Sequence, residues 1–249
     1  GRTINGARRW IKLGGLTFQP AELMKFTLVV YLSSYISTKR DRLRDFQGGL
    51  LPAFVVTGIF LCLTMLQPDF GTVMVMGLMV FILVFVGGAR LAHLGVIVLA
   101  LSPLVYAAIA FKAYRLRRML AFLDPWDDPQ GAGHQIVQSY LAFGSGGVLG
   151  RGLGEGRQKL LFLPERHSDF IFAVIGEELG LWGACLVLLL FGIILWRGVR
   201  IALAADGFSR LLAVGITLLF CIQALFNMAV VTGLMPTKGI ALPLVSYGG

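Results

Sequence analysis

Charged residues are scarce in this chain. Asp, Glu, Lys and Arg make up 14% of its 249 residues, whereas hydrophobic residues make up 57%, and the mean hydropathy is +0.80. Soluble domains carry about a quarter charged residues. The scarcity therefore excludes a soluble globular domain and indicates an integral membrane protein.

Cysteine pairs and nucleotide-binding glycine motifs are also missing. The three cysteines, Cys62, Cys185 and Cys221, lie in apolar runs without a CxxC spacing, which argues against a disulfide framework or a zinc site. The glycines between Gly144 and Gly156 match neither GxGxxG nor GxxxxGK. Nucleotide binding is therefore not expected.

Acidic residues are outnumbered by basic ones, 13 against 22, and the net charge of +9 lies between the apolar runs. This placement favours anionic partners such as membrane lipids or a phosphorylated substrate. No soluble basic domain is present to bind nucleic acid, so we expect no nucleic-acid partner.

Apolar runs dominate the rest of the chain. A membrane helix needs about 20 apolar residues, and shorter runs qualify when flanking residues reach the interface. The pattern predicts an all-α polytopic membrane protein with about six transmembrane helices. They cover roughly 18–37, 49–66, 72–88, 91–111, 170–196 and 211–231.

Six crossings place both ends of the chain on one face of the membrane. The QPDFGT turn and the long connection from Lys112 to Asp169 share that face. Lys and Arg number 8 on the short-loop face and 13 on the other, which by itself puts the long connection in the cytoplasm. The dense basic cluster from Lys39 to Arg44 favours the opposite orientation, so the charges leave it open.

The chain begins on a glycine and ends on PLVSYGG without a terminal helix. We therefore expect residues 1–249 to form a single transmembrane domain truncated at both ends. Its connection 112–169 is too long for a simple linker. We expect a short interfacial helix around YRLRRMLAFLDP, turns through DPWDDPQGAGH, and a second half-apolar helix before a glycine-rich region.

A polar run that leads into the fifth expected span carries the strongest catalytic candidates. It holds Glu165, Arg166, His167 and Asp169 within QKLLFLPERHSDFIFAVIGEELG. One interpretation of Asp169 is a helix N-cap or first-turn acid that binds free backbone N–H groups. The functional interpretation is a general base at the mouth of a cavity. The two are compatible.

Basic residues near both ends of the chain share the face of Asp169. Arg9 and Lys238, taken singly, fit interfacial anchors. Together with Asp169 they provide what is needed to deprotonate a nucleophile while binding a pyrophosphate leaving group. We therefore predict that both bind substrate.

Charged and amide residues also fall within the expected spans. Lys25 lies three residues after Glu22 in the first span, and Glu177 and Glu178 lie about eight residues into the fifth. Because charges in the membrane usually face a cavity or a partner, we expect Lys25 to pair with one of these two glutamates, and Lys25 and Glu178 to contribute to substrate binding. The amides Gln223 and Asn227, four apart, are expected to bond neighbouring helices.

The chain resembles the SEDS proteins (shape, elongation, division and sporulation) in NGARRW, QPAELMK, GHQIVQSYLAFGSGG, QKLLFLPERHSDFIFAVIGEELG and PTKGIALPLVSYGG. These motifs span nearly the whole chain in the family's order. PTKG and the QKL before LPE resemble the division branch, FtsW, more than the elongation branch, RodA. LPERH also occurs in the latter.

The resemblance implies a ten-span glycosyltransferase of the bacterial inner membrane that polymerises lipid II for septal cell-wall synthesis. It also implies a class B penicillin-binding protein transpeptidase and other divisome proteins as partners. This chain would hold spans four to nine. Its long loop and both ends would lie on the periplasmic face.

Site residues are implied position by position. Asp169 matches the family's essential loop aspartate, Arg9 the arginine of NGAxRW, Lys238 the lysine of PTKG, and Glu165 the acid of LPE. Some relatives carry an acid at the position of Leu161, so no role carries over there. Asp169 would accept the proton of the acceptor 4-hydroxyl while Arg9 and Lys238 stabilise the departing undecaprenyl diphosphate, with inversion at the anomeric carbon. A divalent cation, Mg or Mn, is a further means of sharing that charge, and the sequence shows no secure ligand set for it.

Three alternatives stay open. A lipid II flippase would use the same charged groups, although no internal repeat is evident. A non-catalytic division scaffold would not need Asp169. A RodA-type elongation polymerase would perform the same chemistry in another process.

Overall fold

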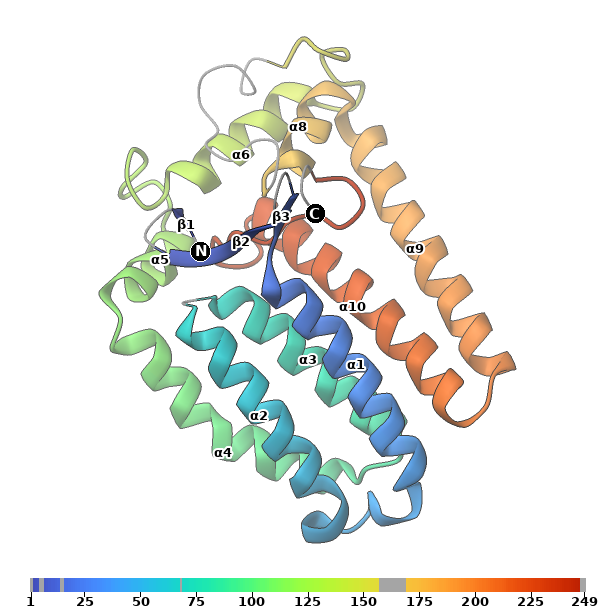
Figure 1. The fold of residues 1–249 in the computed structure, drawn as a ribbon. Helices are drawn as coiled ribbons and strands as arrows, with labels where there is room; N and C mark the ends of the chain where they lie inside the picture. Colours follow the sequence, from blue (N-terminus) through green and yellow to red (C-terminus); the bar gives the residue numbers. More distant parts are fainter. Residues whose placement is uncertain (1, 5–6, 14–15, 68, 157–168, 247–249) are drawn as a thin grey trace. The chain divides into compact units, whose positions relative to one another are not determined.

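The computed structural model describes residues 2–4, 7–13, 16–67, 69–156 and 169–246, with side chains from Gln19 onward (Figure 1). The chain divides into two compact units. The first unit comprises residues 1–98 and 195–222, and the second comprises residues 99–194 and 223–249. The helices α4 (Leu91–Ala110), α9 (Gly180–Ala204) and α10 (Gly207–Val231) each contribute to both units.

The first unit begins with a small antiparallel sheet in the order β1-β2-β3. The strands are β1 (Arg2–Ile4), β2 (Ala7–Leu13) and β3 (Leu16–Phe18). The expectation of a purely helical chain missed these strands. The sequence does carry Asn-Gly and Gly-Gly pairs between them, which are typical of short hairpin connections.

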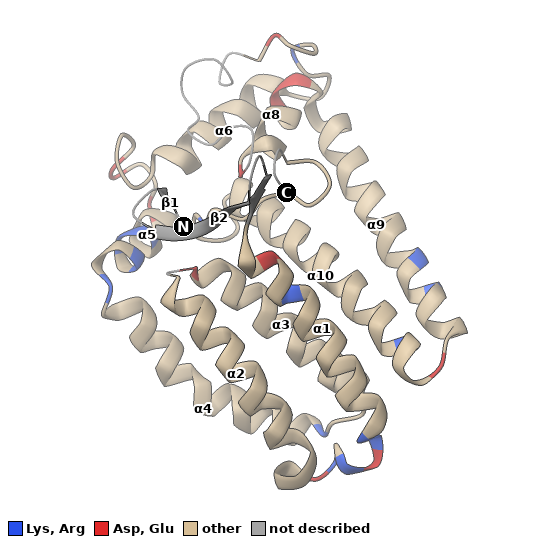
Figure 2. Cartoon of the chain, viewed as in Figure 1, with Lys and Arg blue, Asp and Glu red and all other residues tan. Residues whose placement is uncertain are grey.

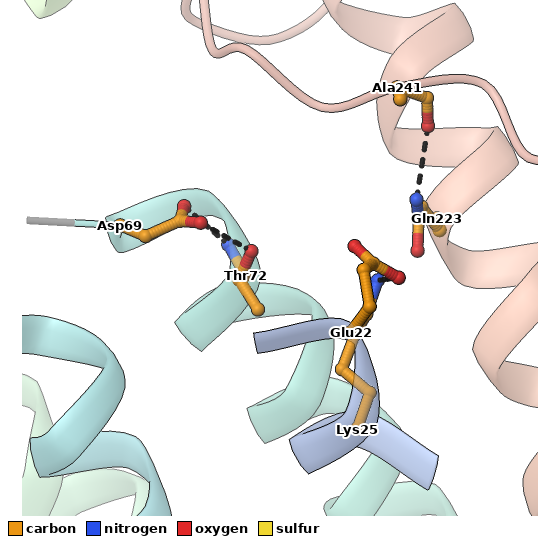
Figure 3. Close-up of polar contacts among 6 residues, drawn as sticks. All are labelled: Glu22, Lys25, Asp69, Thr72, Gln223 and Ala241. Carbon is orange, nitrogen blue, oxygen red and sulfur yellow. Dashed lines mark hydrogen bonds and ion pairs between the residues drawn. The ribbon is translucent and has the colours of Figure 1, made fainter. Parts of the chain in front are cut away.

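Five helices and the first turns of a sixth follow in the same unit. They are α1 (Pro20–Thr38), η1 (Arg40–Arg42), η2 (Phe46–Leu50), α2 (Leu51–Leu66), α3 (Phe70–Val86) and the start of α4 (Leu91–Ala110). Local chemistry sets where they begin. Pro20 occupies the first turn of α1, where its missing N–H is harmless. Asp69 caps α3: its Oδ1 accepts a hydrogen bond from the Thr72 N–H at 3.2 Å and its Oδ2 one from the Thr72 hydroxyl at 2.8 Å (Figure 3).

Basic residues of the first unit gather where α1 leads to α2, where α3 leads to α4 and where α9 leads to α10 (Figure 2). These three connections lie at one end of the unit's helices, as the parity of the spans predicts. The first two also touch: a Cβ at Gly87 would lie 2.5 Å from the Ile36 side chain and 3.4 Å from that of Leu43.

The predicted spans match the helices closely. Among the described residues, four helices are long and apolar enough to cross a membrane: Phe46–Leu66, Leu91–Ala110, Gly180–Ala204 and Gly207–Val231. The apolar α3 is shorter, and the first expected span forms α1. The main prediction, a helical polytopic membrane protein, is confirmed.

The fifth expected span is not one continuous helix. It divides into α8 (Ile171–Glu178) and α9 (Gly180–Ala204). Gly180 has a φ of +65°, a conformation that ends an α-helix and that glycine adopts without strain. Glu177 and Glu178 are therefore the last two residues of the short helix α8, just before this break.

The second unit holds the helices of the long connection, α5 (Ala113–Leu123) and α6 (His134–Gly146), with turns between them. Both helices are where the sequence predicts them. The core of this unit joins α6, α8, α9, the end of α10 and the segment after α10. Its buried residues are Ala142, Phe170, Phe172, Ala173, Ala184, Val187, Phe191, Ala224, Met228, Val231 and Leu242.

Glycines allow α6 and α8 to approach closely. A Cβ on Gly146 would lie 2.1 Å from the Gly176 carbonyl oxygen, and one on Gly176 would lie 2.2 Å from the Phe143 ring. We expect Gly146→Ala to lower the free energy of unfolding by about 1–3 kcal/mol, because the backbone must move to admit the methyl group. Thermal unfolding of the purified protein measures this effect.

The matched control is Gly144→Ala on the same helix. Gly144 is exposed, and a Cβ there meets nothing within 4 Å. This change is expected to raise stability by about 0.5–1 kcal/mol, since alanine favours a helix over glycine. Equal unfolding temperatures for the two variants would show that the close contact does not limit packing.

Candidate functional site

Asp169 lies just before α8 in the second unit and is partly buried. The N-cap position of α8 belongs to Phe170, the residue after Asp169. The Asp169 backbone carbonyl accepts a hydrogen bond from Asn227 Nδ2 of α10 (Gly207–Val231) at 2.7 Å. The neighbouring candidates Glu165 and Arg166, with Leu161, lie outside the described residues.

The Asp169 carboxylate lies against the segment that carries Lys238. A Cβ built on Gly239 would be 2.6 Å from Asp169 Oδ2. Lys238 is partly buried, and its backbone carbonyl accepts a hydrogen bond from the Ile240 N–H at 3.1 Å. The structure therefore brings together Asp169 and the residue next to Lys238, although 69 positions separate Asp169 from Lys238 in the sequence.

Three side chains bind backbone carbonyls of the segment from Thr237 to Ala241. Arg118 Nη1 of α5 donates to the Thr237 oxygen at 2.9 Å, and Asn227 Nδ2 donates to the Ile240 oxygen at 2.6 Å. Gln223 Nε2 donates to the Ala241 oxygen at 3.1 Å (Figure 3). The two amides of α10 therefore bind this segment.

Arg118 and Asn227 are residues whose place at the site the sequence did not predict. The Arg118 guanidinium lies 4.4 Å from the centre of the Tyr114 ring and binds the Thr237 carbonyl. The available signal was the spacing of Gln223 and Asn227. Two buried amides one turn apart indicate a surface that binds polar backbone groups.

Glu178 lies at the other end of α8 from Asp169. That helix has eight residues, about 12 Å at 1.5 Å per residue. Glu177 and Glu178 are 0% and 8% exposed, and a Cβ on Gly156 would lie 3.0 Å from Glu177 Oε2 and 3.1 Å from Glu178 Oε1. Within the second unit, Glu178 thus lies against the glycine-rich loop, residues 147–156, rather than beside the Asp169 carboxylate.

The glycine-rich loop binds the end of α8 through its backbone. The Arg151 N–H donates to the Glu177 carbonyl and the Gly152 N–H to the Glu178 carbonyl, each at 3.0 Å. Gly152 has a φ of +109°, which favours glycine. These contacts give the loop a structural role at the end of α8.

The remaining candidates belong to the first unit. Lys25, 3% exposed, pairs with Glu22 Oε2 at 2.7 Å (Figure 3). The pairing of Lys25 with Glu177 or Glu178 stays a prediction. Lys25 belongs to the first unit, and the two glutamates belong to the second. Arg9 lies in β2, and its side chain is outside the described part.

The described residues include no group of three or more His, Cys, Asp and Glu placed to hold a metal ion. They offer no fit for the divalent cation considered from the sequence. We therefore assign no metal ligands among them.

An apolar cavity of about 520 Å³ lies in the second unit. Phe172, three residues after Asp169, and Met228, which follows Asn227, form part of its wall. The remaining wall residues are Phe143, Gly147, Leu181, Ala184, Cys185, Leu188, Leu225, Ala229, Thr232 and Leu234. The unit thus combines a carboxylate and a lysine-bearing segment with an apolar cavity, an arrangement that suits an amphipathic anionic substrate.

Comparison with known proteins agrees with the motifs. The family described as cell cycle protein (FtsW, RodA, SpoVE) matches residues 1–249. The chain is 48% identical to a probable peptidoglycan glycosyltransferase FtsW of Geobacter sulfurreducens, covering all of this chain and 67% of that protein. It is 45% identical to the stage V sporulation protein E of Bacillus subtilis, covering 68% of that protein. It thus spans about two thirds of the length of these relatives.

Solved structures show the same fold. A peptidoglycan synthase complex that coordinates polymerization and crosslinking contains a chain similar to this one, with a TM-score of 0.77 and 33% identity over all of this chain and 69% of that one. The rod shape determining protein RodA of Thermus thermophilus gives a TM-score of 0.62 at 31% identity, covering all of this chain and 65% of RodA. With the matching motifs and the helices long enough to cross a membrane, these similarities show that the chain is a multi-pass membrane protein of the FtsW/RodA/SpoVE family.

Proposed function

We propose that this protein is a peptidoglycan glycosyltransferase that polymerises lipid II into glycan strands during septal cell-wall synthesis. The observation that carries the proposal is the contact between the Asp169 carboxylate and Gly239, the residue next to Lys238. In this contact a carboxylate lies beside a segment that carries a lysine. Relatives named probable peptidoglycan glycosyltransferase FtsW, 44–49% identical, support the same activity.

Asp169 acts as the general base. One carboxylate oxygen accepts the proton of the acceptor sugar's 4-hydroxyl as that oxygen attacks the donor's anomeric carbon. The bond between that carbon and the diphosphate oxygen breaks, and undecaprenyl diphosphate departs with the bonding electrons. A single displacement of this kind inverts the anomeric configuration.

Cations stabilise the charge that develops on the leaving diphosphate. Lys238 binds a diphosphate oxygen, and Arg9 supplies a second positive charge. Glu165, Lys25 and Glu178 remain proposed substrate-binding residues. The apolar cavity bordered by Phe172 and Met228 accommodates part of the lipid chain.

We infer the membrane location and the partners of the protein from its family. The protein lies in the bacterial inner membrane, with the connection 112–169 and both ends of the chain on the periplasmic face. A class B penicillin-binding protein crosslinks the strands that it makes, which agrees with the similar chain in a complex that coordinates polymerization and crosslinking. Other divisome proteins complete the assembly.

Purified full-length protein with its transpeptidase partner, supplied with lipid II in vesicles, tests the function. We expect glycan polymer resolved by gel electrophoresis. Movement of lipid II between leaflets without polymer would favour the flippase. Absence of both activities would favour the scaffold and contradict the proposal.

A further inference from the structure

We propose that Asn227 and Gly239 are positioning residues that together fix the Asp169 carboxylate against the segment carrying Lys238. The inference rests on the proposed function, because it assigns Asp169 the role of base. It adds two residues for which neither the sequence nor the family resemblance suggested a part in the reaction.

Asn227 joins the two halves of the site through one amide group. Its Nδ2 donates to the Asp169 carbonyl at 2.7 Å and to the Ile240 carbonyl at 2.6 Å. One acceptor is therefore the backbone carbonyl of Asp169 itself, and the other lies two residues after Lys238. Because a single side chain holds both segments, a shift of one is transmitted to the other.

The burial of Asn227 indicates that the two hydrogen bonds donated by its Nδ2 are important at this position. The residue is 2% exposed, and its Oδ1 has no hydrogen-bond partner within the described ranges. A buried acceptor without a donor destabilises the fold. An amide kept here despite that penalty indicates that its two donated bonds matter.

Gly239 controls the other side of the carboxylate. A methyl group at this position would lie 2.6 Å from Asp169 Oδ2, closer than non-bonded atoms approach. Its φ lies outside the left-handed range, so alanine is tolerated by the backbone. Glycine at position 239 therefore leaves space for the Asp169 carboxylate and is not required by the backbone conformation.

Two substitutions test these roles separately. Asn227→Leu keeps the side-chain volume and removes both donated bonds, and Gly239→Ala pushes the carboxylate away. We expect each to lower kcat about 10-fold or more while KM for lipid II stays within about threefold, because a displacement near 1 Å at a reacting group costs up to about 100-fold in rate. Both constants come from initial rates of polymer formation at varied lipid II.

Gln223→Leu is the matched control for Asn227→Leu. Gln223 is also a buried amide of α10, and it donates to Ala241 beyond the contact with Asp169. We expect it to lower the unfolding temperature as Asn227→Leu does, and to lower kcat several-fold less than Asn227→Leu does, because its bond to Ala241 does not reach Asp169. If Asn227→Leu does not fold, Gly239→Ala and its kcat decide the question.

Asp169→Asn, measured in parallel, separates this inference from the proposed function. A wild-type rate for Asp169→Asn would overturn the function itself. An inactive Asp169→Asn together with unchanged kcat in Asn227→Leu and Gly239→Ala would leave the function standing and overturn the positioning roles. Equal kcat losses in Gln223→Leu and Asn227→Leu would also overturn the role of Asn227.

Discussion

Asp169→Asn is expected to reduce the rate of glycan polymerisation by about 10²–10⁴, the contribution typical of a positioned general base. The amide has nearly the shape of the carboxylate but does not accept a proton at neutral pH. The Asp169 backbone carbonyl, which binds Asn227 at 2.7 Å, is unaffected. The fold and its unfolding temperature should therefore change little, and the loss should appear in kcat.

The control for this variant is Asp127→Asn. Asp127 is an exposed acid in the turns between α5 and α6, so its replacement removes the same charge from the same connection. We expect a wild-type rate. Full activity of Asp169→Asn would show that Asp169 is not the general base and would support a non-catalytic scaffold.

Lys238→Ala is expected to lower kcat/KM for lipid II by about 10²-fold, which is the usual effect of removing one group that stabilises developing charge. The side chain is partly buried, and its backbone is held by the bonds of its neighbours Thr237 and Ile240. The segment should therefore keep its path. Lipid II titration of initial rates measures the effect, and unfolding temperature reports the fold.

Two further variants show whether charge is the cause. Lys238→Arg keeps the positive charge and should retain most of the activity, and Lys112→Ala removes an exposed lysine before α5 and should leave kcat/KM near wild type. An Arg variant as impaired as the Ala variant would point to shape rather than charge. Wild-type kcat/KM in Lys238→Ala would exclude the residue from the site.

Long-range hydrophobic pattern made most of the fold predictable. The expected spans 91–111 and 211–231 form α4 (Leu91–Ala110) and α10 (Gly207–Val231), because a helix is the structure that satisfies its own backbone in lipid. The break at Gly180 was not predicted. Hydropathy does not reveal a single residue with left-handed backbone in a continuous apolar run. The helix breaks there because Gly180 has a φ of +65°.

The candidate site was partly predictable. Span parity placed Asp169 and Lys238 on one face, and the structure brings the Asp169 carboxylate to Gly239, next to that lysine. The link through Asn227 was not foreseen, because which carbonyl a buried amide binds depends on the tertiary path of the segment after α10. Arg9 and Glu165 stay predictions.

The proposed reaction is a single displacement in which Asp169 acts as base, and the anomeric configuration of the newly formed bond distinguishes it from other routes. Nuclear magnetic resonance of polymer made from lipid II by the wild-type protein gives that configuration relative to the donor. We expect inversion. Retention would exclude the proposed reaction, because an acceptor oxygen that attacks the anomeric carbon opposite the departing diphosphate inverts that carbon.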